Sequence, residues 1–423
     1  MLLYSRGSVT DKISPDELRE GLFEALNKLG QKKKVLAIPP DITRFHSHSG
    51  ILTDYAYEYY GNKLTDVLPA IGTHYPMTDA EIETMFKKVP KSIFRVHDWR
   101  EGLITLGDVP ADFVKEISEG AIDYSIPIQV DKLLIEGNYD LILSIGQVVP
   151  HEVIGMANYN KNVFIGTGGK EGINKSHFLG AAYGMERIMG RADSPVRKVL
   201  NYGSEHFAKH LPIVYVQTVV DKDETGKLVV RGLYIGDDIE CYNLAAKLSL
   251  EVNFVMLDKP LKKVVVYLEP SEFKTTWLGN KSVYRTRMAI EDNGELIVLA
   301  PGLKEFGEDP GNDKIIRKYG YVGTPKVLQL VKENEDLQNS LGAAAHLIHG
   351  SSEGRFSITY CPGHVSKEEI ESVNFNYADL KEMTQKYNPE KLKDGYNTLP
   401  GGEEIFYISN PALGLWAHKD RFK

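Results

Sequence analysis

The chain has little cysteine and no long apolar run. Its 423 residues include only two cysteines, Cys241 and Cys361, which lie far apart and in no CxxC pattern. This argues against a disulfide framework or a structural zinc site and favours a reducing, cytoplasmic setting. No stretch approaches the roughly 20 apolar residues that span a bilayer, and only a three-residue apolar run follows Met1. We therefore expect neither secretion nor membrane insertion.

Basic charge is not in excess either. Lys and Arg together number 50 against 58 Asp and Glu, which gives a formal net charge of −8. This balance does not favour nucleic acid or an anionic membrane as a partner. A small anionic substrate would need a local positive pocket. P-loop and Rossmann fingerprints are also missing, although the backbone N–H groups of the glycine-rich residues 166–170 could cradle a phosphate.

The sequence does show an alternation of strands and helices. Apolar runs over residues 34–38, 67–71 and 139–146 predict strands, the last of them a central parallel strand covered on both faces. Capping-box spacings beginning at Ser14 and Thr78 predict helix starts. This pattern is typical of an α/β fold.

The pattern changes after about residue 210. We expect an antiparallel hairpin over residues 212–220 and 227–235, a helix over 240–250 and a strand over 262–269. A basic helical run over 277–287 and a further strand over 295–300 should follow. No long linker is visible. We expect two α/β domains with largely parallel sheets and a cleft between them: an N-terminal cofactor-binding domain, 1–260, and a C-terminal domain that closes the substrate cleft, 261–423.

Ionisable residues follow three of the predicted strands. Asp41 and Arg44 follow the first, His74 the second and His151 the third. Ligands of open α/β sheets bind beyond the carboxyl ends of the strands, so these side chains should converge if the strands are neighbours. Two imidazoles facing one crevice could act as general bases on opposite faces of a substrate, as racemisation or epimerisation requires.

His151 is followed by Lys161 after ten residues and by His177 after sixteen more. Lys161 could be a covalent anchor or an anion ligand, and His177 could bind a metal through a neutral ring nitrogen. Taken singly, each has a simpler explanation: a hydrogen-bonded histidine at a strand end, a solvated lysine, and a surface histidine at a helix start. The coincidence of three strand exits favours a functional site.

Three other histidine pairs offer competing metal sites: His46 with His48, His206 with His210, and His346 with His349. The second pair has a four-residue spacing on a predicted helix, which suits chelation. It lacks the glutamate of the zinc-protease motif, and neither of the first two pairs has a third ligand nearby. The third pair falls on a predicted amphipathic helix, and we leave it out of the site.

As a set, these motifs resemble the lactate racemase family, which uses a nickel-pincer nucleotide. The order of the residues and the spacings of ten and sixteen both match, through the first domain to about residue 260 and more loosely beyond. The residues that carry the resemblance are Asp41-Ile-Thr-Arg44, Gly72-Thr73-His74, Pro150-His151, Gly155, Lys161 and His177.

The resemblance implies how the cofactor would be held. His177 would be the protein ligand of nickel, and Lys161 would hold the nucleotide covalently through a thioamide. Further cofactor contacts would come from Gly72, Thr73, Gly155 and Gly168. Proteins that make the cofactor would be partners of the chain.

The resemblance also implies the reaction. His74 and His151 would alternate as base and acid at the hydroxyl of a 2-hydroxy acid, while the C2 hydride moves to the cofactor and returns to the other face. Arg44 would pair with the substrate carboxylate, and Asp41 would orient Arg44 or a substrate hydroxyl.

Two departures from the family bear on the substrate. The family has a Ser-Gly-Gly stretch before the lysine, where this chain has Ala157-Asn-Tyr-Asn160. The family's glutamine-then-lysine pair in the second domain is not reproduced. The substrate residues expected there are Lys281, Tyr284, Arg285 and Arg287. The added polar groups favour a polyhydroxylated acid, so we predict a D-gluconate/D-mannonate 2-epimerase.

Three alternatives stay open. The chain could be a lactate racemase, or a zinc or manganese lyase that removes a proton from a sugar acid with ligands among His46, His48, His206 and His210. It could also bind a sugar acid or carry a cofactor without catalysis. The sequence is compatible with a homo-oligomer.

Overall fold

A computed structural model describes residues 1–422, which divide into two compact units. Unit 1 comprises Met1–Leu179 and Ile188–Asn253, and unit 2 comprises Gly180–Arg187 and the chain from Phe254 onward. The second break lies near the expected boundary at residue 260. Residues 180–187, expected in the first domain, belong to unit 2, where Glu186 accepts hydrogen bonds from Arg287 (3.1 Å) and Arg355 (3.0 Å).

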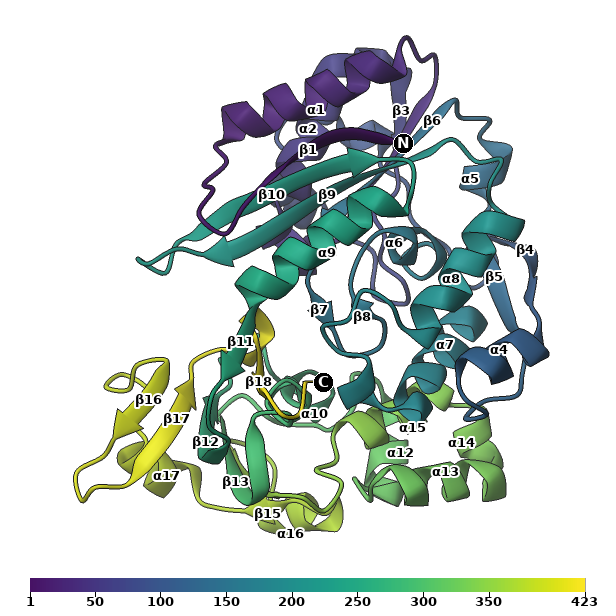
Figure 1. Cartoon of the computed structure of the whole chain (residues 1–423). Helices are drawn as coiled ribbons and strands as arrows, with labels where there is room; N and C mark the ends of the chain where they lie inside the picture. Colours follow the sequence, from purple (N-terminus) through teal and green to yellow (C-terminus); the bar gives the residue numbers. More distant parts are fainter. Residues whose placement is uncertain (423) are drawn as a thin grey trace. The chain divides into compact units, whose positions relative to one another are not determined.

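A six-stranded sheet with the order β1-β10-β9-β6-β2-β3 forms the centre of unit 1 (Figure 1). The strands β9, β6, β2 and β3 are parallel, and β1 and β10 add antiparallel pairs. Antiparallel pairs β4–β5 and β7–β8 lie outside this sheet. The strands are β1 (Leu2–Gly7), β2 (Val35–Ile38), β3 (Leu64–Val67), β4 (Leu103–Val109), β5 (Ile126–Asp131), β6 (Leu141–Gln147), β7 (Pro150–His151), β8 (Gly155–Met156), β9 (Ile213–Lys222) and β10 (Leu228–Gly236).

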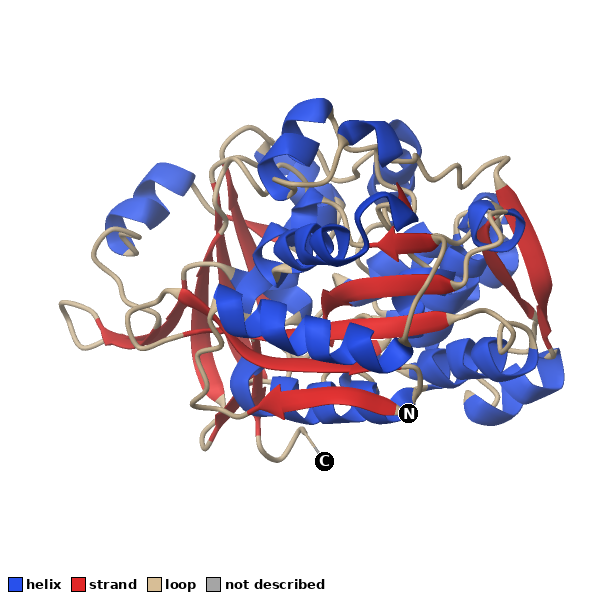
Figure 2. Cartoon of the chain, turned by 90° about the horizontal axis from the view of Figure 1, so that it is seen from above, coloured by secondary structure: helices blue, strands red, loops and turns tan. Residues whose placement is uncertain are grey.

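Helices cover both faces of this sheet (Figure 2). Side chains of α1 and α2 form one core with Leu141, Leu143 and Ile145 of β6, and on the other face α9 packs on β9 and β10 while α6 packs on β6. The helices are α1 (Pro15–Leu29), η1 (Ile42–Ser47), α2 (Ser49–Tyr60), η2 (Gly61–Lys63), α3 (Asp79–Met85), η3 (Lys91–Ile93), α4 (Ala111–Ile117), α5 (Leu133–Glu136), α6 (Asn160–Phe164), α7 (Lys170–Tyr183), α8 (Pro195–His206) and α9 (Ile239–Asn253).

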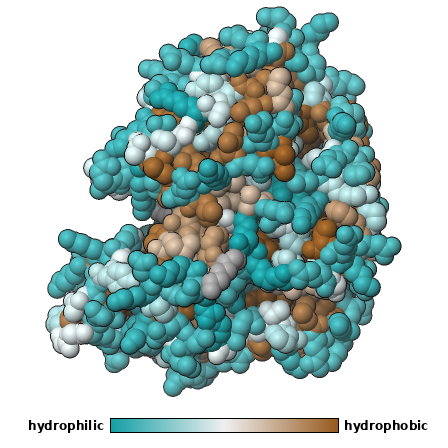
Figure 3. All heavy atoms as spheres, in the orientation of Figure 1, coloured by the Kyte–Doolittle hydropathy of each residue, from teal (hydrophilic) through white to brown (hydrophobic). Residues whose placement is uncertain are grey.

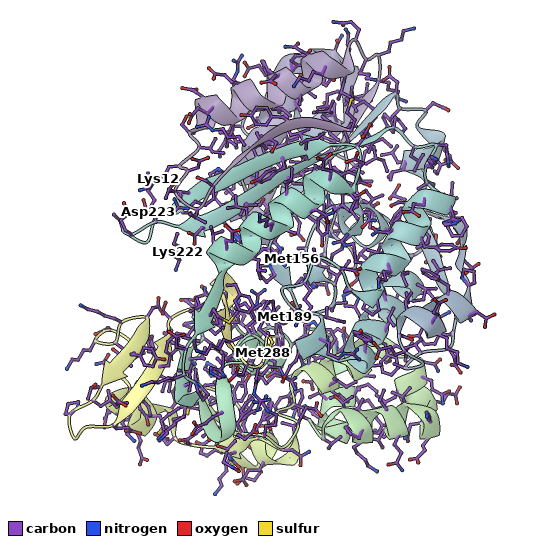
Figure 4. All side chains as sticks on the ribbon, in the orientation of Figure 1. Lys12, Met156, Met189, Lys222, Asp223 and Met288 are labelled. Carbon is purple, nitrogen blue, oxygen red and sulfur yellow. The ribbon has the colours of Figure 1, made fainter. Side chains whose placement is uncertain are left out.

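Local sequence signals explain several of these elements. Ser14 and Thr78 cap α1 and α3 through the expected capping boxes. All residues of β6 are buried, as its unbroken apolar sequence predicted. The predicted hairpin is β9–β10, and Lys12 pairs with Asp223 near its tip (3.2 Å; Figure 4).

Two sequence predictions in unit 1 are wrong. The strand expected over residues 67–71 is β3, which spans Leu64–Val67 and so ends four residues earlier than expected. Beyond Val67 the pairing continues irregularly, with Leu68 and Ala70 donating to the carbonyls of Ala37 (2.9 Å) and Pro39 (2.7 Å) and with an isolated bridge between Pro40 and Ala70. The helix expected to carry His206 and His210 on one face ends at His206, so that chelating spacing is lost.

Unit 2 is built on a second six-stranded sheet, with the order β15-β14-β13-β12-β17-β16. Every pair in it is parallel except β16–β17, and β11 and β18 form a separate parallel pair. The strands are β11 (Phe254–Leu257), β12 (Leu261–Tyr267), β13 (Ile290–Ala300), β14 (Ser357–Pro362), β15 (Asn376–Tyr377), β16 (Gly395–Thr398), β17 (Glu404–Ile408) and β18 (Leu415–His418).

The helices of unit 2 are mostly short. The basic run over residues 277–287 forms two single-turn helices, and the strand expected at residue 295 begins five residues earlier as β13. The helices are η4 (Met185–Arg187), α10 (Thr276–Gly279), α11 (Lys281–Tyr284), α12 (Pro310–Tyr319), α13 (Thr324–Glu333), α14 (Glu335–Gln338), α15 (Leu341–His349), α16 (Lys367–Ser372), α17 (Leu380–Lys386) and η5 (Pro411–Leu413).

The expected fold class, α/β with largely parallel sheets, is confirmed. Hydrophilic residues dominate the face of each unit seen in Figure 3. Among the described residues, no helix has the length and apolarity needed to cross a membrane.

Candidate active site

Three loops of unit 1 bring the predicted site residues to one edge of the sheet. Strand β2 lies between β6 and β3 and is parallel to both, so the loops that follow the three strands leave the sheet at the same edge. Asp41 and Arg44 follow β2, His74 follows β3, and His151 follows β6. The convergence predicted from the three strand exits is therefore present in the fold.

Asp41 and His74 form a hydrogen-bonded pair across two of these loops. Asp41 is buried and caps η1, with Oδ1 accepting from the Thr43 amide (3.1 Å) and hydroxyl. Its Oδ2 lies 2.8 Å from Nδ1 of His74, whose side chain is 63% exposed. Burial alone would raise the pKa of Asp41, but the His74 and Thr43 hydrogen bonds hold that pKa below its usual value.

This pairing revises the expected role of Asp41, which was to orient Arg44 or a substrate hydroxyl. Its carboxylate is engaged by His74 and Thr43 instead. The bond fixes Nδ1 of His74 as the protonated nitrogen and leaves the Nε2 lone pair to accept a proton, with the carboxylate stabilising the resulting imidazolium.

Replacing Asp41 with asparagine should weaken His74 as a base. Hydrogen bonds to charged groups contribute about 1.5–3 kcal/mol, so we expect kcat to fall roughly 10- to 100-fold in D41N. Steady-state kinetics of cofactor-loaded protein would measure this. An unchanged kcat in folded D41N would contradict the role of the pair.

His151 has a different environment. It is buried in β7, and its Nδ1 accepts a hydrogen bond from the Val153 amide at 3.1 Å. Burial lowers the pKa of His151 well below its usual value, although the Glu152 carboxylate, 3.8 Å from Nδ1, acts in the opposite direction. The ring is therefore neutral and carries its proton on Nε2.

Arg44 and Lys161 supply positive charge without internal partners. Both side chains are partly buried, and within residues 1–422 neither the guanidinium nor the ammonium group makes a hydrogen bond or an ion pair. Their charges act on each other and on His151. The site thus gathers the local positive charge that an anionic ligand needs in a chain of net charge −8.

The Lys161 amine should react at unusually low pH. Burial first, and then the Arg44 charge, lower the pKa of Lys161 to about 8, compared with about 10.4 for an ordinary lysine. The amine is protonated and inert below this pH and neutral above it, so acylation of Lys161 should be half-maximal near pH 8. Peptide mapping after timed acylation of the cofactor-free protein would measure this, with the exposed Lys209 as the internal comparison.

His177 has the features of a metal ligand. It lies in α7, and its Nδ1 donates a hydrogen bond to the Ile173 carbonyl at 2.7 Å, which leaves the Nε2 lone pair available. Burial and the nearby Lys161 charge lower its pKa to about 4, so the ring is neutral near pH 7. A neutral imidazole held by a backbone carbonyl is the usual form of a metal-binding histidine. In the described part of the chain, no group of three or more His, Cys, Asp or Glu side chains could hold a metal ion.

Two of the glycines expected to contact the cofactor lie where the backbone packs closely against other segments. Gly155 has φ of +88°, and a Cβ there would lie 2.0 Å from the Arg191 carbonyl oxygen. Gly72 donates its N–H to the Gly166 carbonyl (2.8 Å), which joins the His74 loop to the loop after α6. Thr73, next to it, is exposed.

The first three backbone amides of residues 166–170 are not available to bind a phosphate, although the glycine-rich sequence had suggested this role. The N–H groups of Gly166, Thr167 and Gly168 donate to the carbonyls of Lys161, Val163 and Ile165 and so complete the end of α6. A Cβ at Gly168 would lie 1.9 Å from the Phe164 oxygen, which explains the glycine by packing alone.

Sequence reasoning missed two buried groups beside the site. His97 contacts the Asp131 carboxylate (2.8 Å) and the Gly168 carbonyl (3.0 Å), so it fixes the loop after α6. Arg197 of α8 is 1% exposed and bonds the segment before Lys161. Both partners of His97 are remote in sequence, and no local pattern marks either residue. Glu152 could have been noticed as a carboxylate adjacent to His151.

The segment Ala157-Asn-Tyr-Asn160 is buried. This changes the interpretation of its polar groups, which were expected to face a polyhydroxylated substrate. Asn158 and Tyr159 have φ of +65° and +57°, a conformation that costs a tyrosine on the order of 1–3 kcal/mol. The Asn160 amide donates to Asn201 and Ser204, and the Tyr159 ring packs on Tyr215. These two side chains therefore support the loop. Among the described residues, the buried Nδ2 of Asn158 has no hydrogen-bond partner.

The predicted substrate residues of unit 2 differ in accessibility. Lys281 is partly buried near the Phe273 ring, whereas Tyr284, Arg285 and Arg287 are buried. Arg285 donates to the Gly414 carbonyl (3.1 Å). Arg287 lines a cavity of about 300 Å³, but it already faces the carboxylates of Glu186 (3.1 Å) and Glu353 (3.9 Å). Arg285 and Arg287 thus have partners within the protein, and Lys281 is the most accessible of the four.

Comparison with known proteins agrees with this fold. Residues 22–187 match the family described as the lactate racemase N-terminal domain. A protein from Thermotoga maritima has the same fold, with a TM-score of 0.82 at 26% sequence identity over 98% of this chain and 100% of that one. The lactate racemase apoprotein from Thermoanaerobacterium thermosaccharolyticum gives a TM-score of 0.71 at 16% identity, over 98% and 94% of the two chains. No curated protein matches the chain.

The chain thus contains a lactate-racemase-like N-terminal domain on a fold shared with lactate racemase. The resemblance predicted from the motifs is confirmed to that extent. Asp41, Arg44, His74, His151, Lys161 and His177 all lie inside the matched residues.

Proposed function

We propose that this protein is a racemase or epimerase that inverts C2 of a 2-hydroxy acid. The observation that carries the proposal is the Asp41–His74 pair at the same sheet edge as a neutral, buried His151 and an unpaired Arg44. Such a site offers two imidazoles and one carboxylate-binding group. The match of residues 22–187 to the lactate racemase N-terminal domain supports the same reaction.

Each side chain has a definite task in this reaction. The Arg44 guanidinium binds the substrate carboxylate through a bidentate pair and so fixes which face of C2 is presented. His74 accepts the hydroxyl proton at Nε2, and Asp41 stabilises the charge that forms on the ring. His151 holds a proton on Nε2 that can bond to the substrate oxygen. For His151 to act as the base toward the opposite epimer, its ring proton must move from Nε2 to Nδ1, which releases the bond from the Val153 amide.

The residues present also fit a nickel-pincer nucleotide. Lys161 would hold it through its unpaired amine, and Nε2 of His177 would bind the nickel. When bound, this cofactor supplies a carbon that takes the C2 hydride and gives it back. The proteins that synthesise the cofactor would then be partners of this chain.

A sugar acid, D-gluconate or D-mannonate, is the substrate we propose first. Tyr159 and Asn160 no longer support this choice, because their polar groups are used inside the protein. The remaining support is Asn158, whose buried amide N–H group has no internal acceptor in the described chain and could bond to an added hydroxyl. Lactate is the second candidate, since the fold is shared with lactate racemase.

The proposal can be tested with protein coexpressed with the cofactor-making enzymes. Gluconate, mannonate and each lactate enantiomer are incubated in heavy water, and C2 is followed by NMR. We expect inversion with the C2 hydrogen retained, whereas exchange of that hydrogen for deuterium would indicate proton abstraction, as in a lyase. Absence of turnover of every 2-hydroxy acid by protein with a verified adduct at Lys161 would refute the proposal.

A further inference from the structure

The turn that precedes Lys161 is conformationally costly and is held by a buried arginine. Asn158 and Tyr159 both have positive φ, and α6 begins at the next residue, with Lys161 in its first turn. Glycine adopts such angles without steric cost, whereas asparagine and especially tyrosine need the surrounding structure to impose them. Whatever holds this turn also sets the direction in which Lys161 leaves the backbone.

Arg197 contacts the turn at three places. Nη2 donates to the Met156 carbonyl (2.8 Å) before the turn and to the Asn158 carbonyl (3.2 Å) within it. Nη1 donates to the Asn160 side chain, the first residue of α6. Figure 4 labels Met156 in β8, and Figure 1 shows α8, which carries Arg197, beside α6. One guanidinium thus joins both ends of the turn.

The setting of Arg197 is unusual for a charged group. Its side chain is almost fully buried, lies 4.3 Å from the Tyr242 ring centroid, and has no carboxylate within ion-pair distance anywhere in residues 1–422. A buried charge without a counter-charge is costly. All three of its hydrogen bonds go to the segment before Lys161.

We propose that Arg197 is a positioning residue for Lys161: its planar fork holds the Asn158–Tyr159 turn and thereby aims the amine into the site. The inference rests on the proposed function only in taking Lys161 as the cofactor anchor. Lysine cannot replace it, because an ammonium group is a single point donor and cannot reach three acceptors spread across a turn.

Acylation of cofactor-free protein tests this proposal directly. Burial lowers the pKa of Lys161 most, the Arg44 and Arg197 charges lower it further, and the Glu152 and Asp41 carboxylates raise it. R197K keeps the positive charge and removes the fork. If the fork positions the amine, Lys161 in R197K should move toward solvent, its acylation midpoint should rise from near pH 8, and labelling at pH 8 should slow at least tenfold.

Two further variants complete the test. N160A removes the side-chain acceptor that binds one nitrogen of the Arg197 guanidinium. The acylation midpoint of Lys161 should shift in the same direction as in R197K, which keeps the proposal testable if R197K does not fold. K198M changes the adjacent residue of α8, whose side chain is 47% exposed, and should behave as wild type. Folded R197K or N160A with wild-type acylation would overturn the proposal. The acylation test uses neither substrate nor cofactor. Wild-type acylation of these variants would therefore overturn the role of Arg197 without bearing on the proposed function, and an inactive holoenzyme would not change the acylation result.

Discussion

Replacing Lys161 with alanine is expected to abolish both the covalent adduct and turnover. Lys161 is the lysine that the fold places at the carboxyl edge of the sheet with a partly buried, unpaired amine and a pKa of about 8. Without that amine no covalent anchor is possible, so coexpressed K161A should show the unmodified intact mass. Activity should fall below detection, a larger loss than that of any other single variant.

Lys209→Ala is the matched control for this experiment. Lys209 belongs to the same unit and is exposed. This variant should retain adduct and activity at the wild-type level. An adduct of unchanged mass on K161A, mapped to another lysine, would contradict the assignment of Lys161 as the anchor.

Replacing His74 or His151 with alanine is expected to give the second largest effect. General acid–base groups typically contribute about 10²- to 10⁴-fold, so each variant should lose activity in that range. The adduct at Lys161 should remain, because neither imidazole is needed to hold it. Activity and intact mass measured on the same preparation would separate a loss of proton transfer from a loss of cofactor.

His210→Ala serves as the control of the same residue type. His210 is exposed and lies beyond the end of α8. Its replacement should leave turnover unchanged. If instead H210A or H206A lost activity while H74A kept it, the site would have to be sought among the histidines of the metal-dependent lyase alternative.

Most of the site could be predicted from the sequence because its residues stand directly after strands. An unbroken apolar run such as β6 identifies a buried parallel strand. Ligands of α/β sheets bind beyond the carboxyl ends of such strands, which is where His151 lies. The same reasoning found Asp41 and Arg44. It found His74 as well, although the strand before it was placed too late along the chain, because the apolar run continues beyond Val67, where β3 ends.

What the sequence could not predict depends on contacts between distant segments. The partner of Asp41 is 33 residues away, so the sequence suggested only Arg44 or a substrate hydroxyl as the group that its carboxylate would orient. Arg285 and Arg287 were expected to bind substrate from a basic helical run, yet both are buried and bonded to other parts of the protein. Periodicity describes one element at a time and does not report which other element covers it.

The sequence by itself determined the α/β class, the three strand exits and the residue types at one sheet edge, since hydrophobic period and spacing are local properties. Only the tertiary structure decided the state of those groups. Burial keeps His151 and His177 neutral, burial and then the Arg44 charge lower the pKa of Lys161, and Arg197 supports the turn before it. Desolvation and hydrogen bonding depend on the full three-dimensional surroundings, so the chemistry of these side chains is set by the fold.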